Sequence, residues 1–142
     1  MKLIFYGGSF NPPHKGHLGI IKKCKKMGEK LILMPTIKSP LKTHNSSINS
    51  HHITEMLKLM IQNIDRIEID KFDLLSSGPS YTIDTIEYLI NKYPKFALSM
   101  IIGGDQLKNF SKWKDSNKIM NLVEIIGFNR DFYNYSPPPG MN

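Results

Sequence analysis

The sequence of 142 residues predicts an α/β fold built on a parallel five-stranded sheet with helices on both faces. Short apolar runs alternate with segments whose apolar residues recur at helical spacing, the pattern of strands joined by crossover helices. Two glycine pairs, Gly7-Gly8 and Gly103-Gly104, directly follow apolar runs. Parallel strands joined by right-handed crossovers end at one edge of the sheet, where ligands bind. Together these observations indicate a Rossmann-like fold.

The first part of the chain predicts a strand, a helix and a second strand. Residues 3–6 form the first apolar run, and a helical pattern follows at 15–27. Residues 30–34 begin with Lys30, are otherwise apolar and are stopped by Pro35, as in a buried strand. Residues 36–50 are polar and rich in turn formers, which predicts a surface loop.

The second part predicts two further helices and three further strands. Apolar residues at helical spacing mark a helix over 53–61, with Ser50 as its N-cap. Residues 64–69 alternate like a strand, and the pattern over 82–93 is helical and ends before Pro94. The last two strands are expected at 96–102 and 122–128.

One domain is expected over residues 1–130, with an irregular proline-rich tail at 131–142. Apolar residues make up 40% of the chain, and no apolar run approaches the roughly 18 residues of a membrane span. We therefore expect no membrane partner. The single cysteine, Cys24, rules out an internal disulfide, and a strand pattern stands where a signal peptide would begin. Both observations predict a cytoplasmic protein.

A net charge of +7 favours anionic partners without identifying them. The densest basic cluster, at 22–26, is interpreted as the solvated face of a helix. Aromatic residues are not interleaved with it, as they would be in a nucleic-acid platform. We expect no nucleic-acid partner.

The glycine-rich turn between the first strand and the first helix indicates phosphate binding. Gly7 and Gly8 accommodate backbone angles closed to other residues and let a polyphosphate approach the main chain. Free amides and the helix dipole favour an anion at the start of the helix. His14 and His17 are three residues apart, so they share a helix face and are expected to donate to that anion. Such donors stabilise developing charge, and losing one costs roughly 3 to 4 kcal/mol.

Competing signatures do not occur in the sequence. It contains no Walker A motif, no Gly-x-Gly-x-x-Gly and no His-Glu-x-x-His. His14, His17 and His44, or the pair His51-His52, have the right chemistry for zinc, but nothing fixes a third ligand at a credible spacing. We therefore expect no metal site made by the protein.

The segment Gly8-Ser9-Phe10-Asn11-Pro12, followed by His14-x-Gly16-His17, resembles the signature of the HxGH nucleotidyltransferases. Three later segments are similar in order and spacing to those of bacterial nicotinate-nucleotide adenylyltransferases. They are Ser-Tyr-Thr-Ile-Asp-Thr at 80–85, Ile-Ile-Gly-Gly-Asp at 101–105, and the run from Phe to Trp at 110–113. The resemblance covers roughly residues 2–130, and four motifs together are more specific than HxGH alone.

This resemblance implies an adenylyltransferase that joins AMP from ATP to nicotinate mononucleotide, with Mg²⁺ arriving on the ATP. It implies that His17 contacts the α-phosphate and His14 the leaving phosphates. On the acceptor side it implies that Thr82 recognises the nicotinate carboxylate and that Trp113 stacks on the pyridine ring. The remaining ATP-binding residues that it implies are Gly8, Ser9, Phe10, Lys42, Gly103 and Asp105.

Plainer interpretations of these residues stay open. Ser9 would only stabilise the turn, and Lys42 would be one more solvated charge in a basic loop. Thr82 would be part of a helix cap, and Trp113 would be ordinary core. Asp105 would cap the helix that follows Gly104, a role compatible with binding the ATP ribose.

The sequence departs from the family pattern at two places. Leu41 stands where the family commonly has histidine, and the Ser-Ser/Thr-x-x-Arg segment near the family's C-terminal end has no counterpart. We expect either a domain truncated at its C-terminal end or a compact homologue that uses Arg130 or Lys42 instead. A truncated domain would leave apolar sheet surface uncovered, which predicts self-association into a homo-oligomer or reduced stability.

Three other functions remain in view. They are a related HxGH nucleotidyltransferase with another acceptor, such as phosphopantetheine, a catalytically impaired nucleotide-binding remnant, and a basic nucleic-acid binder. The preference for the acid or the amide of the pyridine nucleotide is also open, because no side chain reports it.

Overall fold

The computed structural model describes residues 1–8, 10, 13–27, 30–36, 50–75 and 81–128. Within them, five parallel strands form one sheet in the order β3-β2-β1-β4-β5. The strands are β1 (Lys2–Gly8), β2 (Lys30–Pro35), β3 (Ile67–Ile69), β4 (Ala97–Gly103) and β5 (Glu124–Phe128). The predicted α/β fold with a parallel five-stranded sheet is confirmed.

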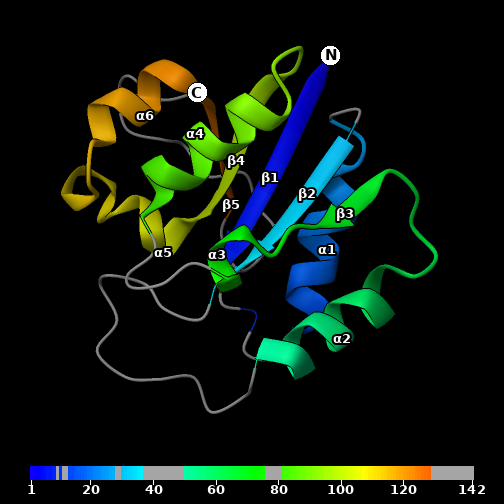
Figure 1. Cartoon of the computed structure of the whole chain (residues 1–142). Coiled ribbons are helices and arrows are strands. Elements are labelled where there is room, and N and C mark those ends of the chain that lie inside the picture. Colours follow the sequence, from blue (N-terminus) through cyan, green and yellow to red (C-terminus); the bar gives the residue numbers. More distant parts are fainter. Residues whose placement is uncertain (9, 11–12, 28–29, 37–49, 76–80, 129–142) are drawn as a thin grey trace.

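Helices connect the strands on both sides of the sheet (Figure 1). They are α1 (Lys15–Cys24), α2 (Ser50–Ile61), α3 (Phe72–Leu75), α4 (Thr82–Lys92), α5 (Gly104–Leu107), the 3-10 helix η1 (Phe110–Lys112) and α6 (Ser116–Leu122). The two central pairings set the register: Phe5 of β1 lies opposite Ile32 of β2 and Met100 of β4. Because all strands run the same way, their carboxyl ends meet at one edge.

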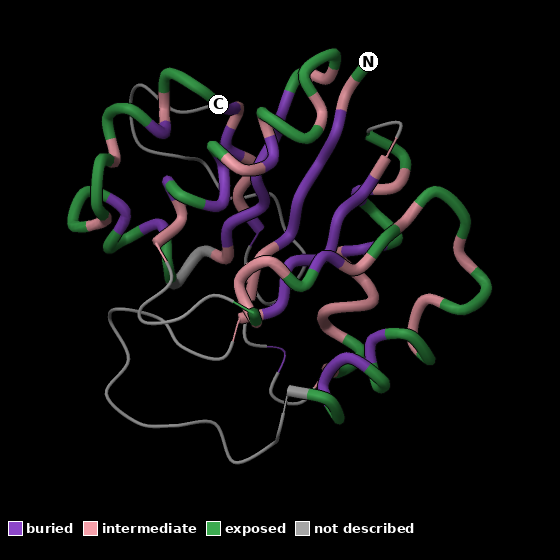
Figure 2. The backbone as a smooth tube through the Cα atoms, in the orientation of Figure 1, coloured by how far each residue is buried: buried purple, intermediate pink, exposed green. Residues whose placement is uncertain are grey.

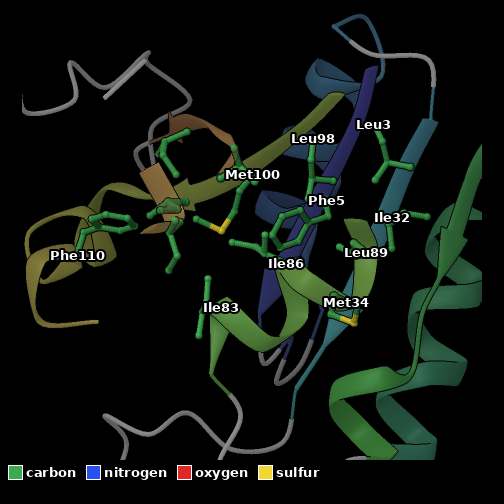
Figure 3. Close-up of a cluster of buried hydrophobic side chains, with 14 of the residues drawn as sticks. Leu3, Phe5, Ile32, Met34, Ile83, Ile86, Leu89, Leu98, Met100 and Phe110 are labelled. Carbon is green, nitrogen blue, oxygen red and sulfur yellow. The ribbon is translucent and has the colours of Figure 1, made fainter. Parts of the chain in front are cut away.

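Alternate residues of the strands feed two separate cores. Leu3 and Phe5 of β1 join the face covered by α4, α5 and α6, and Figure 3 shows Ile86 and Leu89 of α4 beside Phe5 and Ile32. The alternate residues Ile4 and Tyr6 pack against α1 and α2. The central strands are therefore buried on both sides, as in Figure 2, which explains their continuously apolar sequences.

Several element boundaries differ from the predictions. The helix expected over 15–27 ends at Cys24, and the strand expected over 64–69 is confined to Ile67–Ile69. Leu122, expected to begin the last strand, instead ends α6. Ser50, expected as an N-cap, is the first residue of α2. No helix in the described part of the chain is long and apolar enough to cross a membrane.

Candidate active site

The carboxyl edge of the sheet brings together the ends of β1, β2 and β4. Gly8 lies opposite Pro35, and its carbonyl oxygen accepts a hydrogen bond of 2.9 Å from the backbone N–H of Thr36. Helix α1 starts after the end of β1, and α5 starts directly after Gly103 at the end of β4. A Cβ built on Gly103 would meet no atom within 4 Å, so space is open there. The two glycine motifs thus lie at the carboxyl ends of the neighbouring strands β1 and β4.

His14 and His17 cap helix α1 reciprocally. His14 is the N-cap residue, with extended backbone, and its Nδ1 accepts a hydrogen bond of 3.0 Å from the N–H of Gly16. The Nδ1 of His17 accepts one of 3.0 Å from the N–H of His14. The rings stack at 3.9 Å between centroids with 27° between their planes. The pair shares one face, as its spacing predicted, and also satisfies two backbone donors at the helix start.

This capping assigns the tautomer of both rings. A nitrogen that accepts a hydrogen bond carries no proton, so each neutral imidazole holds its proton on Nε2. Burial, and secondarily the nearby His14, lower the pKa of His17 to about 4. His17 is therefore neutral at pH 7. It offers one fixed N–H donor instead of a positive charge.

Two aromatic rings support His17 from within the protein. Phe10 is 1% exposed and meets the His17 ring edge-on at 4.9 Å between centroids. The centroid of the Tyr6 ring lies 5.2 Å from that of Phe10 and 6.2 Å from that of His17. The Phe10 side chain is therefore a packing group that supports the His17 ring from inside the protein.

The backbone strain of the turn lies at a different residue from the one expected. Gly7 and Gly8 are the last residues of β1, whereas Phe10 has a left-handed φ of 46°. The prediction that the glycine pair uses angles closed to other residues is wrong, because the strand continues through both. Gly16 is constrained by space instead: a Cβ there would lie 2.8 Å from Cε1 of His14. The glycine between the histidines therefore makes room for the cap.

The start of α4 is built differently. Its N-cap residue is Tyr81, which has extended backbone and makes no side-chain cap hydrogen bond. Thr82 is the first helical residue, so the structure does not support the alternative interpretation of Thr82 as only a helix cap. The N–H groups of Asp84 and Thr85 donate to the carbonyl oxygen of Tyr81 at 3.1 and 3.3 Å. The N–H groups of Thr82 and Ile83 come before these donors in the chain and lie at the positive end of the helix dipole.

Trp113 follows η1 and is half-buried. Its ring centroid lies 5.1 Å from that of Phe110, with 45° between the planes, and it packs at the margin of the core that contains α4. This position satisfies the packing interpretation and leaves part of the ring exposed for a ligand. Asp105 belongs to α5, but its side chain lies outside the description, as do Ser9 and Lys42.

Sequence reasoning missed a polar cluster beyond the end of β3. Asp70, 8% exposed, and Asp73 of α3 accept hydrogen bonds from α4. An open pocket of about 350 Å³ lies beside them, lined by Asp70, Lys71, Phe72, Leu75 and Tyr88. None of the predicted site residues that the structure describes lines this pocket. The available signal was an aspartate directly after the alternating strand pattern of residues 64–69, at the sheet edge where ligands bind.

No group of three or more histidine, cysteine, aspartate or glutamate side chains suited to a metal ion occurs among the residues placed by the structure. Cys24 is buried, and burial raises the pKa of its thiol to about 12. It is therefore a packing residue of α1 and not a nucleophile.

The family model for cytidylyltransferase-like proteins matches residues 5–141. A protein of Listeria monocytogenes serotype 4a, named probable nicotinate-nucleotide adenylyltransferase, is 37% identical over 139 residues, which are 96% of this chain and 74% of that protein. The nicotinate-nucleotide adenylyltransferase of Bacillus subtilis is 33% identical over the same shares. A probable nicotinate-nucleotide adenylyltransferase of Leptospira interrogans is 41% identical over 89% of this chain and 65% of that protein.

Solved structures share the fold. A putative nicotinate-nucleotide adenylyltransferase from Vibrio parahaemolyticus matches with a TM-score of 0.78 at 19% identity, over 92% of this chain and 75% of that one. Nicotinic acid mononucleotide adenylyltransferase of Plasmodium falciparum, complexed with NaAD, matches with a TM-score of 0.77 at 22% identity. The match covers 96% of this chain and 68% of that one. At these identities the likeness concerns the fold alone.

Proposed function

Because the chain belongs to the nicotinate-nucleotide adenylyltransferase family, we propose that it transfers AMP from ATP to nicotinate mononucleotide. The products are nicotinate adenine dinucleotide and pyrophosphate, and the reaction serves NAD biosynthesis. The observation that carries the proposal is the capped histidine pair at the start of α1, beside the open end of β4. It supplies two imidazole N–H donors where the helix dipole already favours phosphate.

The reaction needs positioning and charge stabilisation more than covalent catalysis. The phosphate of the mononucleotide attacks the α-phosphorus of ATP in line, and pyrophosphate leaves. We assign His17 to the α-phosphate and His14 to the leaving phosphates. The neutral state of His17 suits this role, because a fixed N–H dipole needs no reorganisation as negative charge develops.

The remaining ATP contacts are assigned by the family motifs. Gly8 and the backbone of Phe10 would line the phosphates, together with Ser9 and Lys42. Gly103 lies where ligand approach is open, and Asp105 would hold the ribose hydroxyls. Mg²⁺ belongs to the substrate in this proposal, held by phosphate oxygens and water.

The acceptor is assigned to the start of α4. A carboxylate is stabilised by free amides and by the helix dipole at such a position, and Thr82 adds a hydroxyl there. Trp113, whose ring is half-exposed, would stack on the pyridine. The proposal includes no nucleic-acid or membrane partner, and it places the reaction in the cytoplasm, where ATP is supplied.

Pyrophosphate release from ATP, Mg²⁺ and nicotinate mononucleotide tests the proposal. Turnover with this acceptor, and none with phosphopantetheine, is expected. Turnover with phosphopantetheine alone would assign a different acceptor within the same superfamily. Binding of both substrates without pyrophosphate release would identify a nucleotide-binding remnant.

A further inference from the structure

Two carboxylates in the segment that follows β3 contact one side of α4. Oδ1 of Asp73 accepts a hydrogen bond of 2.7 Å from the hydroxyl of Thr85. Oδ2 of Asp70 accepts hydrogen bonds from the Tyr88 hydroxyl at 2.9 Å and from Nζ of Lys92 at 3.1 Å. The contacted positions of α4 are spaced by three and four residues, so they lie on one helix face.

The bond between Asp73 and Thr85 acts on the first turn of α4. The backbone N–H of Thr85 bonds to the carbonyl of Tyr81, the N-cap residue. Thr85 therefore closes the turn that begins with Thr82. Its side chain is 3% exposed, so water does not readily replace Asp73 as the partner.

Apolar packing alone does not fix the position of α4 along its own axis. Ile83, Ile86 and Leu89 attach α4 to the sheet (Figure 3), and such contacts are not directional. A hydrogen bond between two short side chains is directional, so the bond between Asp73 and Thr85 restrains the position of the first turn of α4 along the helix axis. The contacts of Asp70 with Tyr88 and Lys92 act further along the helix. Asp73 is also desolvated, which raises its pKa to about 6, while the bond to Thr85 acts in the opposite direction.

We propose that Asp73 and Thr85 are positioning residues for the acceptor nucleotide, because their hydrogen bond sets where the first turn of α4 meets the carboxyl edge of the sheet. The inference rests on the proposed function, since it concerns the site assigned to nicotinate mononucleotide. Neither residue touches the acceptor in this account. They act through the amides of Thr82 and Ile83.

Steady-state kinetics of Thr85→Val and Thr85→Ser test the proposal, because valine removes the hydroxyl at nearly constant shape and serine keeps it. Thr85→Val is expected to raise KM for nicotinate mononucleotide roughly tenfold. The kcat and the KM for ATP should stay within about twofold, the signature of lost binding at one subsite. Thr85→Ser is expected to retain the wild-type constants.

Asp73, the partner of Thr85, provides a second and independent pair of variants. Asp73→Ala should reproduce the change in acceptor KM, whereas Asp73→Asn keeps an acceptor oxygen and should restore most of it. The double variant Asp73→Ala with Thr85→Val should be no worse than either single variant. If Thr85→Val does not fold, as judged by circular dichroism, the Asp73 pair decides the question.

Glu87→Gln is the matched control, because Glu87 lies at an exposed position of α4 and forms an ion pair of 3.2 Å with exposed Lys118. It should leave the acceptor KM unchanged. An unchanged acceptor KM in Thr85→Val and Asp73→Ala, or an equal rise in both substrates' KM, would overturn the inference. If wild-type protein does not turn over nicotinate mononucleotide at all, the proposed function itself fails.

Discussion

At the start of α1, the side chains that satisfy the backbone amides are the histidines assigned to ATP, whereas the start of α4 has no side-chain cap and is held from the side by α3. The two helix starts are assigned to the two substrates. In α1, chemistry and local folding depend on the same atoms. In α4, acceptor binding is assigned to Thr82, whereas the helix position depends on Asp73 and Thr85. Binding and helix position should therefore be separable by mutation.

The largest effect is expected at His17. Its replacement by alanine removes a donor to the reacting phosphate and should lower kcat a hundredfold or more. It also removes one half of the capping box, which should lower the free energy of unfolding by about 1 kcal/mol. Pyrophosphate release and urea denaturation measure the two effects. His52→Ala, at an exposed position of α2, should change kcat by less than twofold.

Glycine variants at the two motifs should separate folding from binding. In Gly16→Ala the new Cβ would lie 2.8 Å from the His14 ring, so the cap is displaced. We expect kcat/KM to fall at least tenfold and the free energy of unfolding to fall by about 1 kcal/mol.

Gly103→Ala is the counterpart, because its Cβ would meet no protein atom within 4 Å. It should raise KM for ATP while leaving urea denaturation nearly unchanged. Equal loss of stability in both variants would remove the distinction between a constrained glycine and an open one.

The strands and the histidine motif were predictable from sequence because their signals are local. Residues 30–34 and the motif from Gly8 to His17 are continuous patterns. Helix α3 has four residues, too few to show a period, and α6 runs into an apolar stretch that also suited a strand. Leu122 was therefore assigned to the wrong element.

The details of the site depend on contacts that spacing alone does not fix. The spacing of three between His14 and His17 predicted a shared face, but not that both Nδ1 atoms cap the helix. The bond between Asp73 and Thr85 joins residues twelve positions apart across two elements, and no sequence period marks it. The left-handed angle at Phe10 was missed because glycine is the usual residue there.

Lowering the pH should change the contributions of His17 and Asp73 to the free energy of unfolding in opposite directions. The pKa of His17 is lowered from 6.5 to about 4, so the unfolded state binds more protons in this range, and this contribution to stability is lost as pH falls from about 6.5 to 4. The pKa of Asp73 is raised from 3.8 to about 6, so its contribution is present below pH 3.8 and is lost as pH rises through 6.

Urea denaturation between pH 4 and 7 measures both slopes. We expect His17→Asn to remove a gain with pH of about 1 to 2 kcal/mol, after allowance for screening of a half-buried ring. Asp73→Asn should remove a smaller decrease in the free energy of unfolding with rising pH. Variants that shift the profile in the same direction would show that the two regions titrate alike.

Nitrogen-15 NMR of the histidine rings tests the central claim most directly, because it reports both the tautomer and the contact with nucleotide. We expect His17 to be neutral at pH 7 with its proton on Nε2, and Nδ1 of His14 to carry no proton because it accepts a hydrogen bond. The His17 Nε2 resonance should shift when a non-hydrolysable ATP analogue with Mg²⁺ is added. A ring protonated on Nδ1, or a His17 Nε2 resonance that saturating analogue leaves unmoved, would contradict it.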